Sequence, residues 1–461
     1  MFLKQVWLRY RKSEVGVEDM DGQVALRGHI VSLKGDPFFS PKDKVFVDIN
    51  DGLVIIRDGI IQEVGQYNEL IDHVDNIAAV VNYPDCIITA GFIDTHVHYV
   101  QTPIIASFGE HLIDWLNKYT FPEEERFKNP DYAAAVAQIF FDELLRNGTT
   151  SALVFCSVFP QSVDAFFNES LQRNMRMIGG KVLMDRNAPP AVLDTAQSGY
   201  DDSKALIKKW HGRGRISYAI TPRFAPTSTE AQLTAAAALH REYPSTLIQT
   251  HISENVSEVS WVRSLFPDRQ DYLDVYDHAG LLGPGTVLAH GVHLTESERE
   301  HCAQTKTTVA HCPTSNLFLG SGLFHMRQAK NPKHPINVGL GTDIGGGTRF
   351  SLLETMGEAY KVGELTSYPL DGVKLFYLAT LGGAEVLGIA DKVGSVEVGK
   401  EADLVVLDPQ ATPLLAFRST QITSTAEQIF LLAIMGDDRT VAATYVAGQL
   451  AYNREKAGTA V

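Results

Sequence analysis

The sequence has few cysteines and no long apolar run. Its four cysteines are spread over 461 residues, and none of them belongs to a C-x-x-C pair. Cysteines this sparse do not build a disulfide framework, so we expect reduced thiols. No segment reaches the roughly 18 consecutive apolar residues that a membrane-spanning helix needs, and the N-terminal segment lacks the apolar core of a signal peptide. We therefore expect a cytoplasmic protein without membrane association.

Basic residues are also scarce relative to acidic ones. The chain has 40 Lys and Arg against 55 Asp and Glu, which gives a formal net charge of −15. Because binding to nucleic acids and to anionic membranes depends on clustered basic charge, this composition argues against both kinds of partner. Hydrophobic residues make up 44% of the chain and aromatic residues 9%, so the sequence can form a large core and does not resemble a disordered protein.

Both ends of the chain are rich in short strand-like segments. Residues 44–66 contain three β-rich runs separated by Asp-Gly turns, which are typical of hairpins. A similar pattern returns at 393–408 and at 440–452. We predict that residues 1–85 and 391–461 pair into one small β-sandwich domain.

The middle of the chain alternates short apolar segments with helical stretches, such as DYAAAVAQIFFDELLRNG at 131–148. Eight segments are strand candidates: 86–93, 150–156, 176–184, 215–221, 246–251, 286–290, 307–311 and 336–342. Eight parallel strands with intervening helices make a (β/α)8 barrel, which typically needs about 250 residues. We therefore predict an α/β fold with a TIM-like (β/α)8 barrel over residues 86–390.

Polar side chains gather where these predicted strands end, which is the catalytic face of such a barrel. A single histidine at a strand end is more often a structural residue than a ligand, and an H-x-H pair alone is a weak motif. Five histidines and an aspartate at the ends of five strands together predict a metal site, because neutral imidazoles and a carboxylate suit a divalent metal ion such as zinc. These residues are His96, His98, His251, His290, His311 and Asp343.

The order of these motifs resembles that of the metal-dependent amidohydrolase superfamily. GFIDTHVH, a lone histidine after the fifth strand, AHG, HCPTSN and GTD follow one another at the family's spacing, and SVEVGKEADLVVLD is similar to the family's terminal segment. The resemblance covers about residues 20–452. It implies four metal ligands: His96, His98, His251 and Asp343. Two-metal members place a lysine at the end of the fourth strand, where this chain reads ITPR, so we expect one Zn²⁺ per chain.

The resemblance also implies a hydrolytic deamination. A divalent ion lowers the pKa of a bound water to about 7 and so makes a nucleophile available at neutral pH. Glu254 is placed as in the deaminase branch of the superfamily and would donate a proton to a ring nitrogen. Asp343 would pass the proton of the water to the leaving amine, and His290 would stabilise the attacking oxygen. The H-x-E and P-C-x-x-C pattern of cytidine-type zinc deaminases is absent.

Three segments narrow the substrate: HYVQTP at 98–103, LIDWLNKYTFPEE at 112–124 and TPRFAP at 221–226. Together they resemble the guanine deaminase family, which implies that guanine is converted to xanthine and ammonia in purine catabolism or salvage. The residues that this resemblance assigns to substrate binding are His98, Gln101, Trp115, Arg223, Phe224, His251, Glu254, His290 and Asp343. It also implies a homodimer. In isolation, residues 112–124 could instead form an ordinary amphipathic helix, and Arg223 a surface ion pair.

Two other classes of function remain open at the level of sequence. The first is another aminoheterocycle hydrolase on the same barrel, acting on a triazine, a pterin or a different purine. The second is a non-catalytic scaffold that kept the fold, which is disfavoured because all four expected ligands are present.

Overall fold

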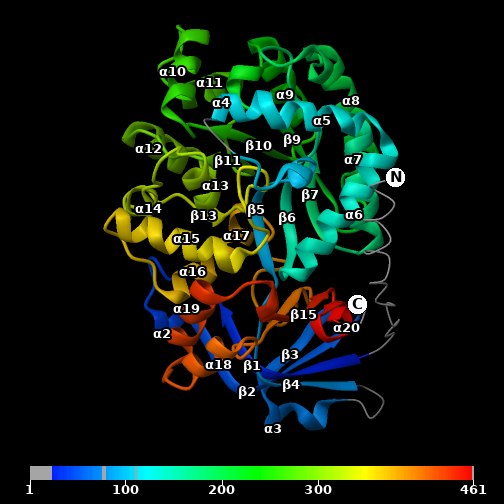
Figure 1. Ribbon diagram of the computed structural model, residues 1–461, viewed down its shortest axis with the longest axis vertical. Helices are drawn as coiled ribbons and strands as arrows, with labels where there is room; N and C mark the ends of the chain where they lie inside the picture. Colours follow the sequence, from blue (N-terminus) through cyan, green and yellow to red (C-terminus); the bar gives the residue numbers. More distant parts are fainter. Residues whose placement is uncertain (1–22, 75–78, 109–111, 459–461) are drawn as a thin grey trace.

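The barrel and the small domain lie one above the other along the long axis of the molecule (Figure 1). The first barrel strand follows directly after the last N-terminal strand of the small domain. The computed structural model describes residues 23–74, 79–108 and 112–458. The N-terminal part of the predicted small domain, residues 1–22, lies outside the described residues, and so does the segment considered as a signal peptide. No helix among the described residues is long and apolar enough to cross a membrane.

Eight parallel strands run side by side in chain order and form the barrel, which confirms the predicted fold class. These strands are β5 (Phe92–His98), β6 (Thr149–Phe155), β7 (Arg176–Gly180), β9 (Ser217–Pro222), β10 (Leu247–Ile252), β11 (Thr286–His290), β12 (Thr308–His311) and β13 (Val338–Leu340), with the short β8 (Val182–Leu183) beside β9. The first and last strands meet because the amide of Asp343 donates to the carbonyl of His96 at 2.9 Å. The barrel therefore closes next to the predicted ligands.

Helices cover the outside of the barrel. They are α6 (Pro130–Arg146), α7 (Pro160–Gln172), α8 (Ala196–Trp210), α9 (Glu230–Glu242), α10 (Val256–Leu265), α11 (Tyr272–Ala279), α12 (Glu296–Thr305), α13 (Pro313–Phe318), α14 (Met326–Ala329), α15 (Leu352–Leu365), α16 (Gly372–Ala379) and α17 (Leu381–Val386). The sequence sets where α6 begins, because the side chain of Asn129 accepts from the amides of Asp131 and Tyr132 and Pro130 occupies the first turn. The apolar side of α6 then packs into the core.

A second group of short helices follows β5 and lies over the barrel end that is far from the small domain (Figure 1). It consists of η3 (Tyr99–Ile104), α4 (Leu112–Trp115), the π-helical η4 (Leu116–Thr120), α5 (Phe121–Glu125) and η5 (Arg126–Lys128). Residues 112–124, for which an ordinary amphipathic helix was the alternative interpretation, are helical and contain a π-helical turn. Its side chains reach the carboxyl ends of the barrel strands.

The small domain is built on one seven-stranded mixed sheet from both ends of the chain, in the order β16-β15-β14-β4-β1-β2-β3. Its strands are β1 (Gln23–Leu33), β2 (Phe46–Arg57), β3 (Ile60–Gln66), β4 (Ala79–Ala90), β14 (Leu404–Leu407), β15 (Val441–Val446) and β16 (Gln449–Asn453). Helices accompany them: α2 (Lys42–Val45), α3 (Tyr67–Leu70), η2 (Ile71–His73), α18 (Pro413–Ser419), α19 (Thr425–Met435), η8 (Asp438–Thr440) and α20 (Arg454–Gly458). Of these, α19 packs against α15 and α16 of the barrel.

The strand predicted at 86–93 is divided between the two sheets. Residues up to Ala90 belong to β4 of the small domain, and the barrel strand begins at Phe92. The change occurs at Gly91, where an added Cβ would lie 2.3 Å from Oγ1 of Thr150. Only glycine lets the two segments approach this closely. The division into residues 1–85 with 391–461 and residues 86–390 stays a proposal, and its first boundary falls inside β4.

Candidate metal centre and active site

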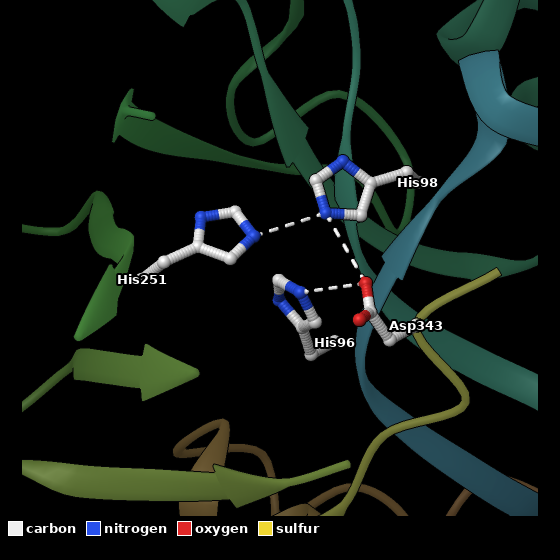
Figure 2. A group of neighbouring side chains, drawn as sticks. All are labelled: His96, His98, His251 and Asp343. Atoms are coloured by element: carbon white, nitrogen blue, oxygen red, sulfur yellow. Dashed lines mark hydrogen bonds and ion pairs between the residues drawn. The ribbon is translucent and has the colours of Figure 1, made fainter. Parts of the chain in front are cut away.

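Four of the predicted ligands come together at the carboxyl ends of the barrel strands (Figure 2). His96 and His98 lie two residues apart on β5, His251 lies on β10, and Asp343 follows β13. One ligand atom from each residue lies within 4.8 Å of the others, and all four side chains are buried. Nε2 of His98 is 3.1 Å from Nε2 of His251, and Oδ1 of Asp343 is 3.1 Å from Nε2 of His96.

The donor atoms of this cluster fit a divalent metal ion. Ligands that each lie about 2.1 Å from one zinc ion are roughly 3.0–3.6 Å from their neighbours, close to the separations seen here. Nδ1 of His251 donates to the carbonyl of Arg223 at 2.7 Å, which leaves a lone pair on Nε2 facing the cluster. Nε2 of His96 is buried, and apart from its contact with Oδ1 of Asp343 it has no partner among the described residues. A metal ion would satisfy these nitrogens.

The protonation states of the cluster also suit metal binding. Burial lowers the pKa of His98 and of His251 far below the usual value, which favours neutral imidazoles. For Asp343, burial alone would raise the pKa, but the neighbouring histidines, His96 foremost, lower it to about 2. Three neutral nitrogens and one carboxylate are therefore available at neutral pH.

A second possible ligand group is less suitable. His96, His290 and Cys312 also lie within 4.8 Å of one another, but this group shares His96 with the first. Burial raises the pKa of the Cys312 thiol far above its usual value, so the thiolate that binds metal is disfavoured. The described residues therefore offer one complete ligand set.

Glu254 and His290 lie next to the cluster and face each other. Oε2 of Glu254 is 3.4 Å from Nε2 of His290, and Oδ2 of Asp343 is 3.7 Å from the same nitrogen. Nδ1 of His290 donates to the side-chain oxygen of Asn316 at 2.8 Å, which fixes the ring orientation. Burial raises the pKa of Glu254 to about 7. Burial lowers the pKa of His290, but Glu254 and Asp343 outweigh this and raise it above its usual value.

The backbone of Glu254 is held by a carboxylate that sequence reasoning missed. Oε2 of Glu258 accepts from the amides of Glu254 and Asn255 at 2.8 and 3.1 Å. The other oxygen of Glu258 accepts from the hydroxyl of Tyr272 at 2.7 Å. The signal was present, because Asn255 and Glu258 form a capping box at the start of α10. Sequence reasoning also missed the role of Asn316, which orients His290, although Asn316 ends the HCPTSN motif.

A cavity adjoins the cluster. His98, His251, Glu254, His290 and Asp343 contribute to its wall together with the four further predicted substrate-binding residues, Gln101, Trp115, Arg223 and Phe224. Leu112 and Leu116 cover another part of the wall, so α4 and η4 close the cavity on one side. All nine predicted substrate-binding residues thus line one cavity, while His96 lies outside its wall.

His311 is the one histidine of the predicted strand-end set that belongs neither to the cavity wall nor to a ligand group among the described residues. Its ring stacks on Phe324 with the ring centres 4.5 Å apart, and burial lowers its pKa to about 3. The next residue, Cys312, faces the cluster. Because successive side chains of an extended segment point to opposite sides, His311 points away.

Arg223 is not a surface residue. Its Nη1 donates to both carboxylate oxygens of Glu124, at 2.8 and 3.0 Å, and both side chains are buried. The alternative interpretation of Arg223 as part of a surface ion pair is therefore wrong, because its ion pair is buried. Sequence reasoning included Glu124 in a family-like segment but gave it no role, and no local pattern connects it with Arg223.

The barrel, the candidate ligand cluster and the small sheet together are typical of the amidohydrolase class of hydrolases, and the sequence comparison agrees. A model described as "Amidohydrolase family" matches residues 87–451. The chain belongs to this family.

Within this family, the chain is similar to several guanine deaminases. A guanine deaminase of Escherichia coli (strain K12) is 50% identical over 406 residues, which cover 88% of this chain and 92% of that protein. A solved structure of E. coli guanine deaminase superposes with a TM-score of 0.91 at 47% identity and covers 93% of this chain and 99% of that chain. The structure of guanine deaminase from C. acetobutylicum, solved with guanine in its active site, superposes with a TM-score of 0.83 at 28% identity. The match covers 93% of this chain and 100% of that chain.

Proposed function

We propose that this protein is a guanine deaminase that converts guanine to xanthine and ammonia in purine catabolism or salvage. The observation that carries the proposal is the cavity wall, where proton-transfer groups and planar-ring contacts lie beside the ligand cluster. The relatives that share up to half of the sequence over most of its length bear the same name. Their similarity supports guanine above other aminoheterocycles.

The metal in this proposal is one Zn²⁺ per chain, held by His96, His98, His251 and Asp343. When bound, this ion supplies an activated water and a positive charge near the attacking oxygen. The proposal of a single ion is supported by the absence of lysine at the end of β9, which reads Ile-Thr-Pro-Arg. The raised pKa of Cys312 supports it as well.

The side chains around the cavity would divide the proton transfers. With a pKa of about 7, Glu254 is partly protonated at neutral pH and can give its proton to the ring nitrogen beside the attacked carbon. Asp343 is ionised and can accept a proton from the attacking water before the amine leaves. His290 has a raised pKa, which favours the doubly protonated ring; with Nδ1–H held by Asn316, its Nε2 proton would point toward the developing oxygen charge.

The remaining wall residues would recognise the purine. Arg223 carries only donors and suits the ring carbonyl of guanine, while Gln101 offers both a donor and an acceptor. Phe224 and Trp115 would contact the flat faces of the ring. Among the described residues, the buried indole nitrogen of Trp115 has no hydrogen-bond partner, so it can also donate to a ring nitrogen.

The direct test is incubation of the purified, metal-loaded protein with guanine, following loss of its absorbance and release of ammonia. We expect stoichiometric ammonia from guanine and none from adenine, a triazine or a pterin. Preference for one of the latter compounds would favour the alternative, another aminoheterocycle hydrolase. Absence of turnover with all of them in metal-loaded protein would favour a scaffold. We also propose that the protein is a cytoplasmic homodimer. Light scattering of the purified protein measures its mass in solution and so tests the dimer.

A further inference from the structure

We propose that Glu124 is a positioning and selectivity residue that neutralises Arg223 and thereby makes the cavity select an uncharged oxo-heterocycle over an anionic one. This inference rests on the proposed function and concerns how the same cavity chooses its ligand.

Glu124 lies behind Arg223 as seen from the cavity. Arg223 follows β9 and contributes to the cavity wall, whereas Glu124 lies on α5 and is not part of that wall. The Glu124 side chain is completely buried, and both of its carboxylate oxygens accept from the same nitrogen, Nη1 of Arg223. The guanidinium carbon also lies 5.5 Å from the ring centre of Phe121, another residue of α5. The helix therefore fixes the guanidinium from behind and from the side.

This contact leaves part of the guanidinium available. Arginine has five N–H donors and no acceptor. Among the described residues, none accepts a hydrogen bond from Nε or Nη2 of Arg223. With Nη1 occupied by Glu124, these two nitrogens are the donors that remain for a carbonyl oxygen of the ligand. Glu124 thus determines which edge of Arg223 is presented.

The pair also changes the charge that a ligand meets. A lone guanidinium in a buried cavity attracts carboxylates, phosphates and other anions strongly, because water does not screen it. The carboxylate of Glu124, at 2.8 Å from Nη1, compensates that charge. Arg223 then acts as a set of directed donors with little net charge, which suits neutral guanine better than an anionic purine.

The inference is tested with Glu124→Gln, which keeps the shape of the side chain and removes its charge. Guanine kinetics and inhibition by urate, a purine that is an anion at pH 7, are measured side by side. We expect the KM for guanine to rise about tenfold, since the orientation of Arg223 is lost, with a smaller change in kcat. We expect urate to bind about tenfold more tightly, because the guanidinium charge is no longer compensated.

The matched control is Glu125→Gln, which removes the same charge from the exposed neighbouring position of α5. It should leave both constants unchanged. Glu124→Asp keeps the charge and should retain weak urate binding even if guanine turnover falls. A purely structural role of Glu124 predicts weaker binding of guanine and urate alike. Unchanged constants, or urate binding that weakens with guanine binding in Glu124→Gln, would overturn the inference.

The outcome can be separated from that of the proposed function. If the parent protein does not deaminate guanine, the proposed function fails, and calorimetric binding of guanine and urate still measures the selectivity of parent and variant. If Glu124→Gln does not fold, a structure of the parent protein with bound guanine tests the inference instead. Arg223 must then keep Nη1 on Glu124 and place Nε or Nη2 on the guanine oxygen. Release of Arg223 from Glu124 on binding would contradict the inference.

Discussion

The two ends of the barrel both contain charged side chains that are buried or partly buried, but these are arranged in different ways. At the amino-terminal ends of the strands, beside the small domain, Arg176 and Arg215 surround Glu401 and Asp403. Nε of each arginine donates to Oε2 of Glu401 at 2.9 Å, and Nη2 of Arg215 donates to Asp403 at 2.6 Å. Each charge in this interdomain cluster has an opposite charge next to it.

At the carboxyl-terminal ends, Arg223 and Glu124 form a similar compensated pair, but the neighbouring histidines and carboxylates are crowded together with incomplete hydrogen bonding. Buried nitrogens of His96, His98 and His290 have no hydrogen-bond partner among the described residues, and the pKa of Glu254 is raised to about 7. Buried polar atoms are normally satisfied, so unsatisfied ones indicate a missing ligand or a chemical role. Salt-bridged side chains thus connect the small domain with the barrel, whereas buried ring nitrogens without hydrogen-bond partners mark the site of chemistry.

The largest expected effect comes from removing a ligand of the crowded end. In His96→Ala or His98→Ala, we expect metal content and activity to fall to background together, because the metal loses one of its four protein donors and alanine offers no replacement. The barrel should keep its circular dichroism spectrum. Elemental analysis and guanine turnover measure the effect, and activity retained in either variant removes that residue from the ligand set.

Glu254→Gln separates proton transfer from metal binding at the same end. We expect turnover to fall by about 10² or more while metal content stays near that of the parent protein, since Glu254 is assigned to proton transfer and not to the ligand set. Metal analysis and kcat are measured on the same sample. Parental turnover in this variant would show that another group transfers the proton.

Arg223→Ala tests recognition apart from chemistry. We expect kcat/KM for guanine to fall by at least about 10²-fold, mainly through KM, with the metal still bound. The variant also leaves Glu124 buried without its partner, so some loss of stability should accompany the kinetic change. A kcat/KM close to that of the parent protein would mean that the purine lies elsewhere in the cavity.

The smallest effect on activity is expected at the interdomain cluster. Glu401→Gln should lower the free energy of unfolding by roughly 2 kcal/mol, because two partly buried guanidiniums lose their shared carboxylate, while kcat stays unchanged. Glu358→Gln, which breaks an exposed pair with Lys361, is the control and should cost at most about 0.5 kcal/mol. Urea unfolding of both variants measures the difference, and a loss of kcat in Glu401→Gln would break the distinction between the two ends.

The pH dependence of that stability difference has a definite sign. Burial alone would raise the pKa of Glu401, but Arg176 and Arg215 lower it below its ordinary value of 4.5. A carboxylate with a lowered folded-state pKa stabilises the fold above its unfolded-state pKa and loses this contribution as the pH falls through the folded-state value. The difference between parent and Glu401→Gln should therefore be constant above about pH 5 and shrink below about pH 4.5.

Local patterns explain why much of this molecule could be predicted from its sequence. His96 and His98 share a face because they lie two residues apart in an extended segment, and strands alternating with helices bring distant strand ends to one face of a barrel. The pairing of Glu124 with Arg223 could not be predicted, because 99 residues separate them and only the packing of α5 over the barrel joins them. The passage from β4 to β5 was missed for a similar reason, since Gly91 acts through its distance from Thr150.

A titration of metal-free protein with Zn²⁺, read out as ammonia released from guanine, tests directly whether the strand-end cluster holds one catalytic metal ion. We expect activity that rises linearly and reaches its maximum at one equivalent per chain, with no response in His98→Ala. Maximal activity only at two equivalents would contradict the single complete ligand set. Full activity without added or bound metal would contradict the assignment of the strand-end cluster as the site of chemistry.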